Sequence, residues 1–103
     1  MQNKVKNFND NKTCHKTPMP TYARILNIQS EMGELAKEYL EKSKYGTQPF
    51  DLKDEFKEEY GDVLYSLLSL ANELNINSEE CLNLTLHKLQ TRINKNNSMK
   101  SGN

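Results

Sequence analysis

The sequence predicts an all-α protein with three main antiparallel helices per chain, which assemble into a four-helix-bundle core in a homo-oligomer. Apolar residues recur every three to four positions through three long segments, and turn-forming residues separate these segments. The chain has 103 residues, and a domain of that size buries a smaller share of its surface than a larger one. Association with further copies is therefore a natural source of additional core.

Both ends of the chain are poor in apolar residues. Residues 1–17 are rich in Asn and Lys and contain only Val5 and Phe8 as bulky apolar residues. Such a segment cannot bury enough surface to offset the cost of ordering it, so we expect a mobile arm. Residues 95–103 consist mainly of Asn, Lys, Ser and Gly, and we expect a disordered tail. The helical domain is thereby placed at 18–94.

The first helix is expected over Thr21–Lys42. It follows Pro20, and proline is tolerated before and within the first turn of a helix. Residues 43–50 contain Tyr-Gly and Gln-Pro pairs, which favour a loop between antiparallel helices.

The second helix is expected from about Leu52 to Leu74, with Asp51 as its N-cap. The third helix is expected to begin after Asn77, because Asn77 and Glu80 have the spacing of a capping box. It is expected to run to about Asn94, with an apolar stripe formed by Cys81, Leu82, Leu86, Leu89 and Ile93.

Two segments within these helices repeat the pattern acid, large residue, glycine, acid: Glu31-Met32-Gly33-Glu34 and Glu59-Tyr60-Gly61-Asp62. A single acid pair three residues apart is more often a solvated helix surface than a site. The repetition favours a site, because glycine inside a helix costs about 1 kcal/mol relative to alanine and suggests close approach of another group.

Four converging carboxylates repel one another unless a proton or a cation bridges them. Oxygen ligands without Cys or His select hard ions, so Mg²⁺ is expected and Mn²⁺ is a possible substitute. A di-iron centre of the four-helix type requires Glu-x-x-His pairs, and neither His15 nor His87 has a Glu three residues before it.

Small and basic residues near the acids could contact a substrate. Ser66 and Ser69 continue the line of acids along the second helix, which indicates a polar cavity with room for a ribose or a base. Lys88 and Arg92 lie one turn apart beside the apolar stripe of the third helix. Alone, they would indicate a solvated basic edge near a helix C-terminus, where the helix dipole favours cations.

The charge distribution excludes one class of partner. The chain has 14 basic and 14 acidic residues, but residues 29–80 carry five basic against thirteen acidic side chains. An acidic centre argues against nucleic acid, because phosphate backbones need clustered Lys and Arg. Cys14 and Cys81 form no metal-binding spacing. No segment has the length and hydropathy of a membrane span or signal peptide, so a cytoplasmic protein without membrane association is expected.

The region from Tyr22 to Ile93 resembles the MazG-like nucleotide pyrophosphohydrolases of the all-α NTP pyrophosphatase superfamily. The resemblance rests on the segments 30–37 (Ser-Glu-Met-Gly-Glu-Leu-Ala-Lys), 58–64 (Glu-Glu-Tyr-Gly-Asp-Val-Leu) and 71–76, and on the closing Lys88-x-x-x-Arg92. The family pattern is Glu-Glu-x-x-Glu followed by Glu-x-x-Asp. This chain departs from it at Ser30, where the family often has its first Glu, and the departure leaves the number of bound metal ions open.

The resemblance implies hydrolysis of a (deoxy)nucleoside triphosphate to a monophosphate and pyrophosphate by metal-activated water, in nucleotide-pool housekeeping. It makes Glu31, Glu34, Glu59 and Asp62 the metal ligands and catalytic acids. Lys88 and Arg92 become candidates for phosphate contact, and Asn27 joins Tyr22, Tyr45 and Phe50 as unranked candidates for contact with the nucleoside. Several points stay open: the preferred base or sugar, modified nucleotides as substrates, the general base, and dimer against tetramer. The alternative function is a non-catalytic helical dimerisation module whose acids are merely solvated.

Overall fold

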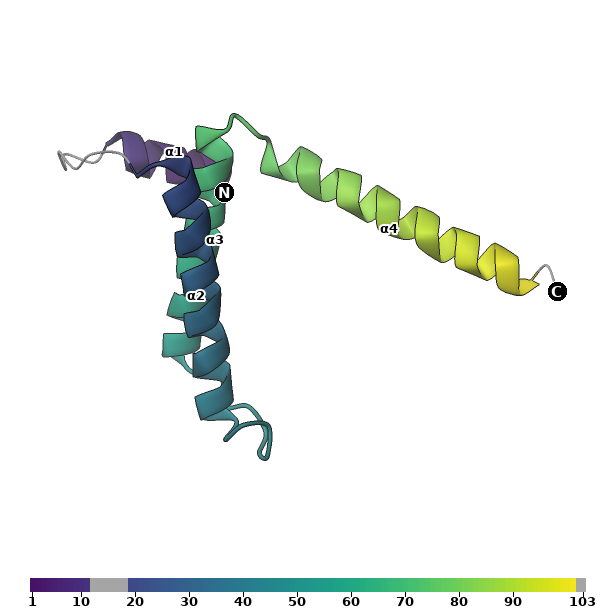
Figure 1. Cartoon of the computed structure of the whole chain (residues 1–103), viewed down its shortest axis with the longest axis horizontal. Coiled ribbons are helices and arrows are strands. Elements are labelled where there is room, and N and C mark those ends of the chain that lie inside the picture. The colour runs from purple at the N-terminus through teal and green to yellow at the C-terminus, as the bar shows by residue number, and fades with distance from the viewer. Residues whose placement is uncertain (12–18, 102–103) are drawn as a thin grey trace.

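The computed structural model describes residues 1–11 and 19–101, and these form four α-helices without a β-strand (Figure 1). In chain order they are α1 (Gln2–Asp10), α2 (Thr21–Lys42), α3 (Asp54–Glu73) and α4 (Ser78–Ser101). The all-α prediction is confirmed. The structure has one helix more than the three expected, because α1 lies within the segment expected as a mobile arm. The remainder of that arm, residues 12–17, lies outside the described residues.

α1 is held on α3 mainly by polar side chains. The Phe8 ring meets the Tyr65 ring edge-on, with 6.1 Å between the ring centroids. Asn9 donates a hydrogen bond from Nδ2 to Ser69 Oγ (3.1 Å), and its Oδ1 accepts one from the Tyr65 hydroxyl. A docked helix was not expected here because the count of apolar residues ignores polar contacts of this kind.

α2 and α3 pack side by side as a helical hairpin (Figure 1). The bounds of α2 agree with the prediction, whereas α3 begins two residues later than expected. The prediction of Asp51 as N-cap is wrong: the chain stays extended through Lys53, which occupies the N-cap position without a side-chain hydrogen bond. Asp51 instead forms an exposed ion pair with Lys53 (3.4 Å). Asp54 and Glu55 supply the negative charge that the helix N-terminus favours.

The loop between the two helices is closed by a buried serine and an aromatic cluster. Ser43 is buried, and its Oγ accepts a hydrogen bond from the backbone N–H of Gly46. Gly46 ends a turn over 44–46 in which all three φ angles are positive. The Phe50 ring stacks on Tyr39 (4.5 Å between centroids) and meets Phe56 edge-on (4.9 Å). These contacts fix the end of the hairpin, so the helices stay in register along their length.

The single chain buries very little apolar surface. Val63, Leu68 and Ala71, all on α3, are the buried apolar residues of the described chain. The radius of gyration is 18.5 Å, against about 13 Å for a compact domain of this length. Two lines with a spacing of seven residues are each between 46% and 58% exposed: Ile25, Met32 and Tyr39 on α2, and Tyr60, Leu67 and Leu74 on α3.

α4 extends away from the other three helices (Figure 1). Its start agrees with the predicted cap, since Asn77 Oδ1 accepts a hydrogen bond from the Glu80 N–H (3.1 Å). The end of α4 differs from the prediction, because the helix continues beyond Asn94 to Ser101, through most of the tail expected to be disordered. No glycine or proline interrupts residues 78–101, so nothing in the sequence stops the helix. No helix in the described residues is long and apolar enough to cross a bilayer.

Candidate functional site

Three carboxylates meet where the middle of α2 faces the middle of α3. Glu31 comes from α2, while Glu59 and Asp62 are three residues apart on one face of α3. One oxygen of each side chain lies within 4.8 Å of the others. Oxygens bound to one Mg²⁺ are separated by about 3 to 4 Å at the usual bond length, so a small side-chain rotation would let a single cation contact all three.

The carboxylates of the cluster repel one another. Removal from water raises the pKa of Glu59 above its usual 4.5, and the nearby carboxylates of Asp62, Glu34, Glu31 and Glu38 raise it further, in that order. Among the described residues, no Lys or Arg forms an ion pair with Glu31, Glu59 or Asp62. An unbalanced group of oxygen donors is the environment that a hard cation stabilises.

The four predicted acids are not equivalent. Glu34 is exposed and does not belong to the cluster of three, although its charge acts on Glu59. Glu38, which sequence analysis did not single out, also acts on Glu59 through its charge. Its side chain is only 18% exposed, its Oε1 is buried without a hydrogen bond, and its one ion pair, with Lys42, is long at 3.9 Å. The spacing of seven from Glu31 placed Glu38 on the same helix face, and that signal was available in the sequence.

The two glycines of the repeated pattern do not have the role expected within one chain. A Cβ atom built on Gly33 or Gly61 would meet nothing within 4 Å. Neither position needs glycine for contacts inside the chain. Both glycines lie beside the acids and leave the backbone accessible there.

The predicted phosphate-binding residues are not brought to the acids within the chain. Lys88 and Arg92 are exposed on α4, which projects away from the α2–α3 hairpin (Figure 1). Asn27 is half-buried on α2, one turn before Glu31. Of the possible nucleoside contacts, Phe50 is occupied by its packing in the loop.

The space expected above the serines of α3 is filled. Ser66 and Ser69 are 5% and 2% exposed, and Asn9 of α1 covers Ser69 through a hydrogen bond. The expectation of a cavity beside these two serines is therefore wrong, because α1 lies there.

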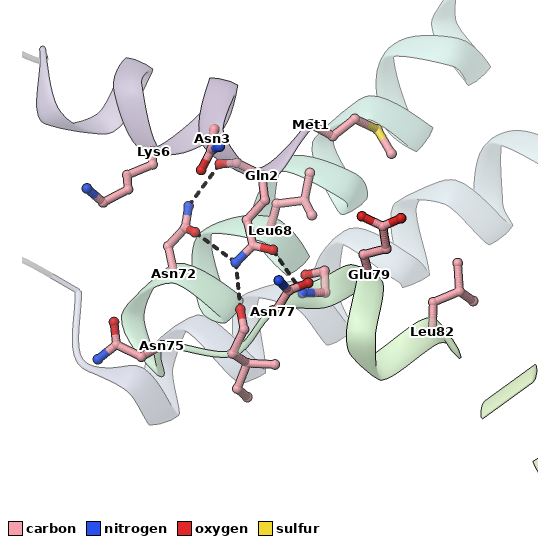
Figure 2. A pocket seen from close by; sticks show the side chains of 12 residues that line it. Met1, Gln2, Asn3, Lys6, Leu68, Asn72, Asn75, Asn77, Glu79 and Leu82 are labelled. Atoms are coloured by element: carbon pink, nitrogen blue, oxygen red, sulfur yellow. Dashed lines mark hydrogen bonds between the residues drawn. The ribbon is translucent and has the colours of Figure 1, made fainter. Parts of the chain in front are cut away.

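A cavity of about 700 Å³ does exist at another place, between α1, the C-terminal end of α3 and the start of α4 (Figure 2). Gln2 crosses it: its Nε2 donates to Asn72 Oδ1 (2.9 Å) and to the Ile76 carbonyl (2.6 Å), and its Oε1 accepts from the Ser78 N–H (2.9 Å). None of the three clustered acids lines this cavity. Asn72 is about 15 Å along α3 from Asp62, so the cavity and the acid cluster are separate.

Comparison with known proteins agrees with the acid pattern. Residues 21–96 match the model of the MazG nucleotide pyrophosphohydrolase domain. The uncharacterised protein YpjD of Bacillus subtilis (strain 168) is 40% identical over 73 residues, which are 68% of this chain. The matched region spans 64% of that relative's length. No solved structure matches the chain.

Proposed function

Because the chain belongs to the MazG nucleotide pyrophosphohydrolase family, as the match over residues 21–96 shows, we propose that it hydrolyses (deoxy)nucleoside triphosphates in the presence of Mg²⁺. The products are a nucleoside monophosphate and pyrophosphate, and the role is control of the nucleotide pool in the cytoplasm. The observation that carries this proposal is the cluster of Glu31, Glu59 and Asp62, whose oxygens lie within 4.8 Å of one another and form no ion pair with a Lys or Arg in the described part of the chain.

The donor set fits Mg²⁺, with Mn²⁺ as a substitute. Mg²⁺ prefers carboxylate oxygens and commonly shares its ligands between protein and phosphate groups. Glu31, Glu59 and Asp62 would hold the ion, and Glu34, whose charge acts on Glu59, would be the fourth ligand. When bound, the ion supplies charge stabilisation for the phosphate chain and lowers the pKa of coordinated water.

The other residues of the site have complementary roles in the proposal. Glu38 presents a buried oxygen without a hydrogen bond, which suits it to accept a proton from water or to orient that water. Asn27, one turn before Glu31, would contact the sugar or the base. Lys88 and Arg92 bind phosphate oxygens and balance the charge of a triphosphate.

The active form in this proposal is a homodimer or tetramer with α3 in the interface. The exposed apolar lines of α2 and α3 support association, since a solvated monomer would leave most of its large apolar residues in water. Light scattering at micromolar concentration tests this, and a monomer would contradict it.

The exposed apolar lines also favour the second candidate, a non-catalytic dimerisation module. The two candidates differ in chemistry. A set of standard and modified (deoxy)nucleoside triphosphates should be incubated with the protein and Mg²⁺, and pyrophosphate and orthophosphate measured separately. Pyrophosphate release that Glu59→Gln abolishes and the adjacent exposed variant Glu58→Gln retains supports the enzyme. No hydrolysis of any triphosphate would leave the module as the better account.

A further inference from the structure

The cavity between α1, the end of α3 and the start of α4 has the size of a small-molecule site. Its volume is about 700 Å³, and pockets that hold small ligands measure about 300–1,000 Å³. Its walls come from three parts of the chain: α1, the C-terminal part of α3 with the connection that follows it, and the first two turns of α4 (Figure 2). A compact ligand in this cavity is therefore contacted by three separate elements.

Carboxamides make up most of the polar lining. Five of the twelve lining residues carry this group: Gln2, Asn3, Asn72, Asn75 and Asn77. Two of them bond to each other, because Gln2 Nε2 donates to Asn72 Oδ1 (2.9 Å) and Asn72 Nδ2 donates to the Gln2 carbonyl (3.3 Å). Asn77 uses only its oxygen, which caps α4. Among the described residues, the side chains of Asn3 and Asn75 and the Nδ2 of Asn77 have no hydrogen-bond partner. The cavity therefore offers unpaired donors and acceptors beside a fixed pair of amides.

The rest of the lining is apolar or balanced in charge. Leu68, Ile76 and Leu82 contribute apolar surface. Lys6 and Glu79 are the ionisable side chains that line the cavity, and their charges are opposite. A ligand with several negative charges meets no excess of positive charge here, so the lining is complementary to an uncharged ligand.

We infer that this cavity binds an uncharged nucleobase, carried by a nucleoside. A carboxamide holds a donor and an acceptor side by side. Asn and Gln side chains use this pair to bind two adjacent atoms on the edge of a base, such as N6 and N7 of adenine. In the cavity the edge of the base takes the unpaired amide groups of Asn3 and Asn77, and the flat faces of the ring lie against the apolar side chains.

This site is distinct from the acid cluster. None of Glu31, Glu59 and Asp62 lines the cavity, and a nucleoside has no phosphate groups that a metal ion at those acids could bind. The inference does not depend on the proposed hydrolysis, so the two can be tested separately.

Nuclear magnetic resonance titrations of the isotopically labelled protein test the inference. The probes are adenosine, guanosine, cytidine and uridine, added with EDTA so that no metal ion occupies the acid cluster. At least one nucleoside should shift the side-chain amide signals of Gln2, Asn3 and Asn77 in a saturable way. The inference is wrong if no probe shifts these signals up to its solubility limit, or if the shifts are confined to residues around Asn27 and Glu31.

Two substitutions remove the unpaired amide groups without removing a hydrogen bond of the fold. Asn3→Ala removes a whole carboxamide, whereas Asn77→Asp removes the Nδ2 donor and retains an oxygen that can cap α4. Each should weaken nucleoside binding about fivefold, the effect of one lost hydrogen bond. The control Asn83→Asp makes the same change at an exposed position of α4 outside the cavity and should bind like the parent. Parental affinity in both Asn3→Ala and Asn77→Asp would overturn the inference.

Glu59→Gln separates this site from the proposed active site. The variant should bind the nucleoside with the affinity of the parent, although it should lose pyrophosphate release. Loss of nucleoside binding in Glu59→Gln would assign the ligand to the acid cluster and overturn the inference. A parent that binds the nucleoside at the cavity but releases no pyrophosphate from any triphosphate would support the inference and count against the proposed function alone.

Discussion

Replacing Glu59 and Glu58 separately by glutamine distinguishes a metal centre from a solvated acidic surface. Both changes remove one negative charge from adjacent positions of α3. Glu59 is half-buried with an oxygen in the acid cluster, whereas Glu58 is exposed and lies outside it. Without metal, Glu59→Gln should melt at the temperature of the parent or slightly above it, because the repulsion from Asp62 and Glu31 is relieved. Glu58→Gln should be close to the parent in both conditions.

The expected size of the metal effect follows from mass action. At a Mg²⁺ concentration tenfold above its dissociation constant, a ligand that binds only the folded state contributes about 1.4 kcal/mol. For a chain of this length that corresponds to a rise in melting temperature of about 6–11 °C. Thermal melts followed by circular dichroism, at one protein concentration and increasing Mg²⁺, should show this rise for the parent and for Glu58→Gln. Glu59→Gln should lose most of it.

The pH dependence of the same melts has a defined sign. The pKa of Glu59 is raised in the fold by desolvation and then by neighbouring carboxylates. A raised carboxyl pKa favours the folded state below the ordinary value and loses that contribution as the pH rises through the folded-state value. The metal-free parent should therefore lose stability relative to Glu59→Gln as the pH rises from about 4.5, and Mg²⁺ should reverse the trend. The metal centre would be refuted if millimolar Mg²⁺ left the melting temperature of the parent unchanged. It would also be refuted if the parent and Glu59→Gln lost equal stability as the pH rises.

Three further changes test the packing that positions the site. Gln2→Ala removes three hydrogen bonds at the α3–α4 junction and should cost about 1 kcal/mol of folding free energy. Hydrogen exchange in the first turn of α4 should become faster. The control Asn3→Ala, at the neighbouring exposed position, should leave exchange unchanged. Ser69→Leu overpacks a buried position under α1 and should destabilise the protein by about 1–3 kcal/mol in urea titrations. An unchanged unfolding midpoint would show that α1 does not cover Ser69. Leu68→Ala should cost about 2–4 kcal/mol in the same titrations. Equal losses in the exposed control Leu84→Ala would contradict the burial of Leu68.

The periodicity of the sequence was sufficient for the main helices because the information is local. α2 was predicted to its terminal residues, and the Asn77 cap of α4 was visible as a spacing. α1 was missed because its docking depends on polar contacts such as Asn9 to Ser69, which join residues 60 apart in the sequence. Such partners cannot be paired by periodicity.

The acid cluster was anticipated through the repeated pattern, and the structure brings together three of its four members. Which acids converge depends on how α2 and α3 are each rotated about their own axes in the hairpin. Sequence periodicity does not determine these rotations. For this reason periodicity did not identify Glu38, although it presents a buried oxygen. The separation of Lys88 from the acids was also invisible, since a helical wheel gives the face of a residue but not the direction in which its helix leaves the hairpin.

The length of α4 makes the angle at its first turn decisive. Arg92 is 14 positions beyond Ser78, so a lever of about 21 Å separates its Cα from the junction. A rotation of only about 5° at the junction would move Arg92 by about 2 Å, and displacements of that order are enough to cost a reaction a hundredfold or more. A guanidinium carried so far from its anchor can be accurate only if the anchor is stiff. If Arg92 binds phosphate as proposed, the amide of Gln2, remote from the acid cluster, determines how accurately that positive charge is positioned.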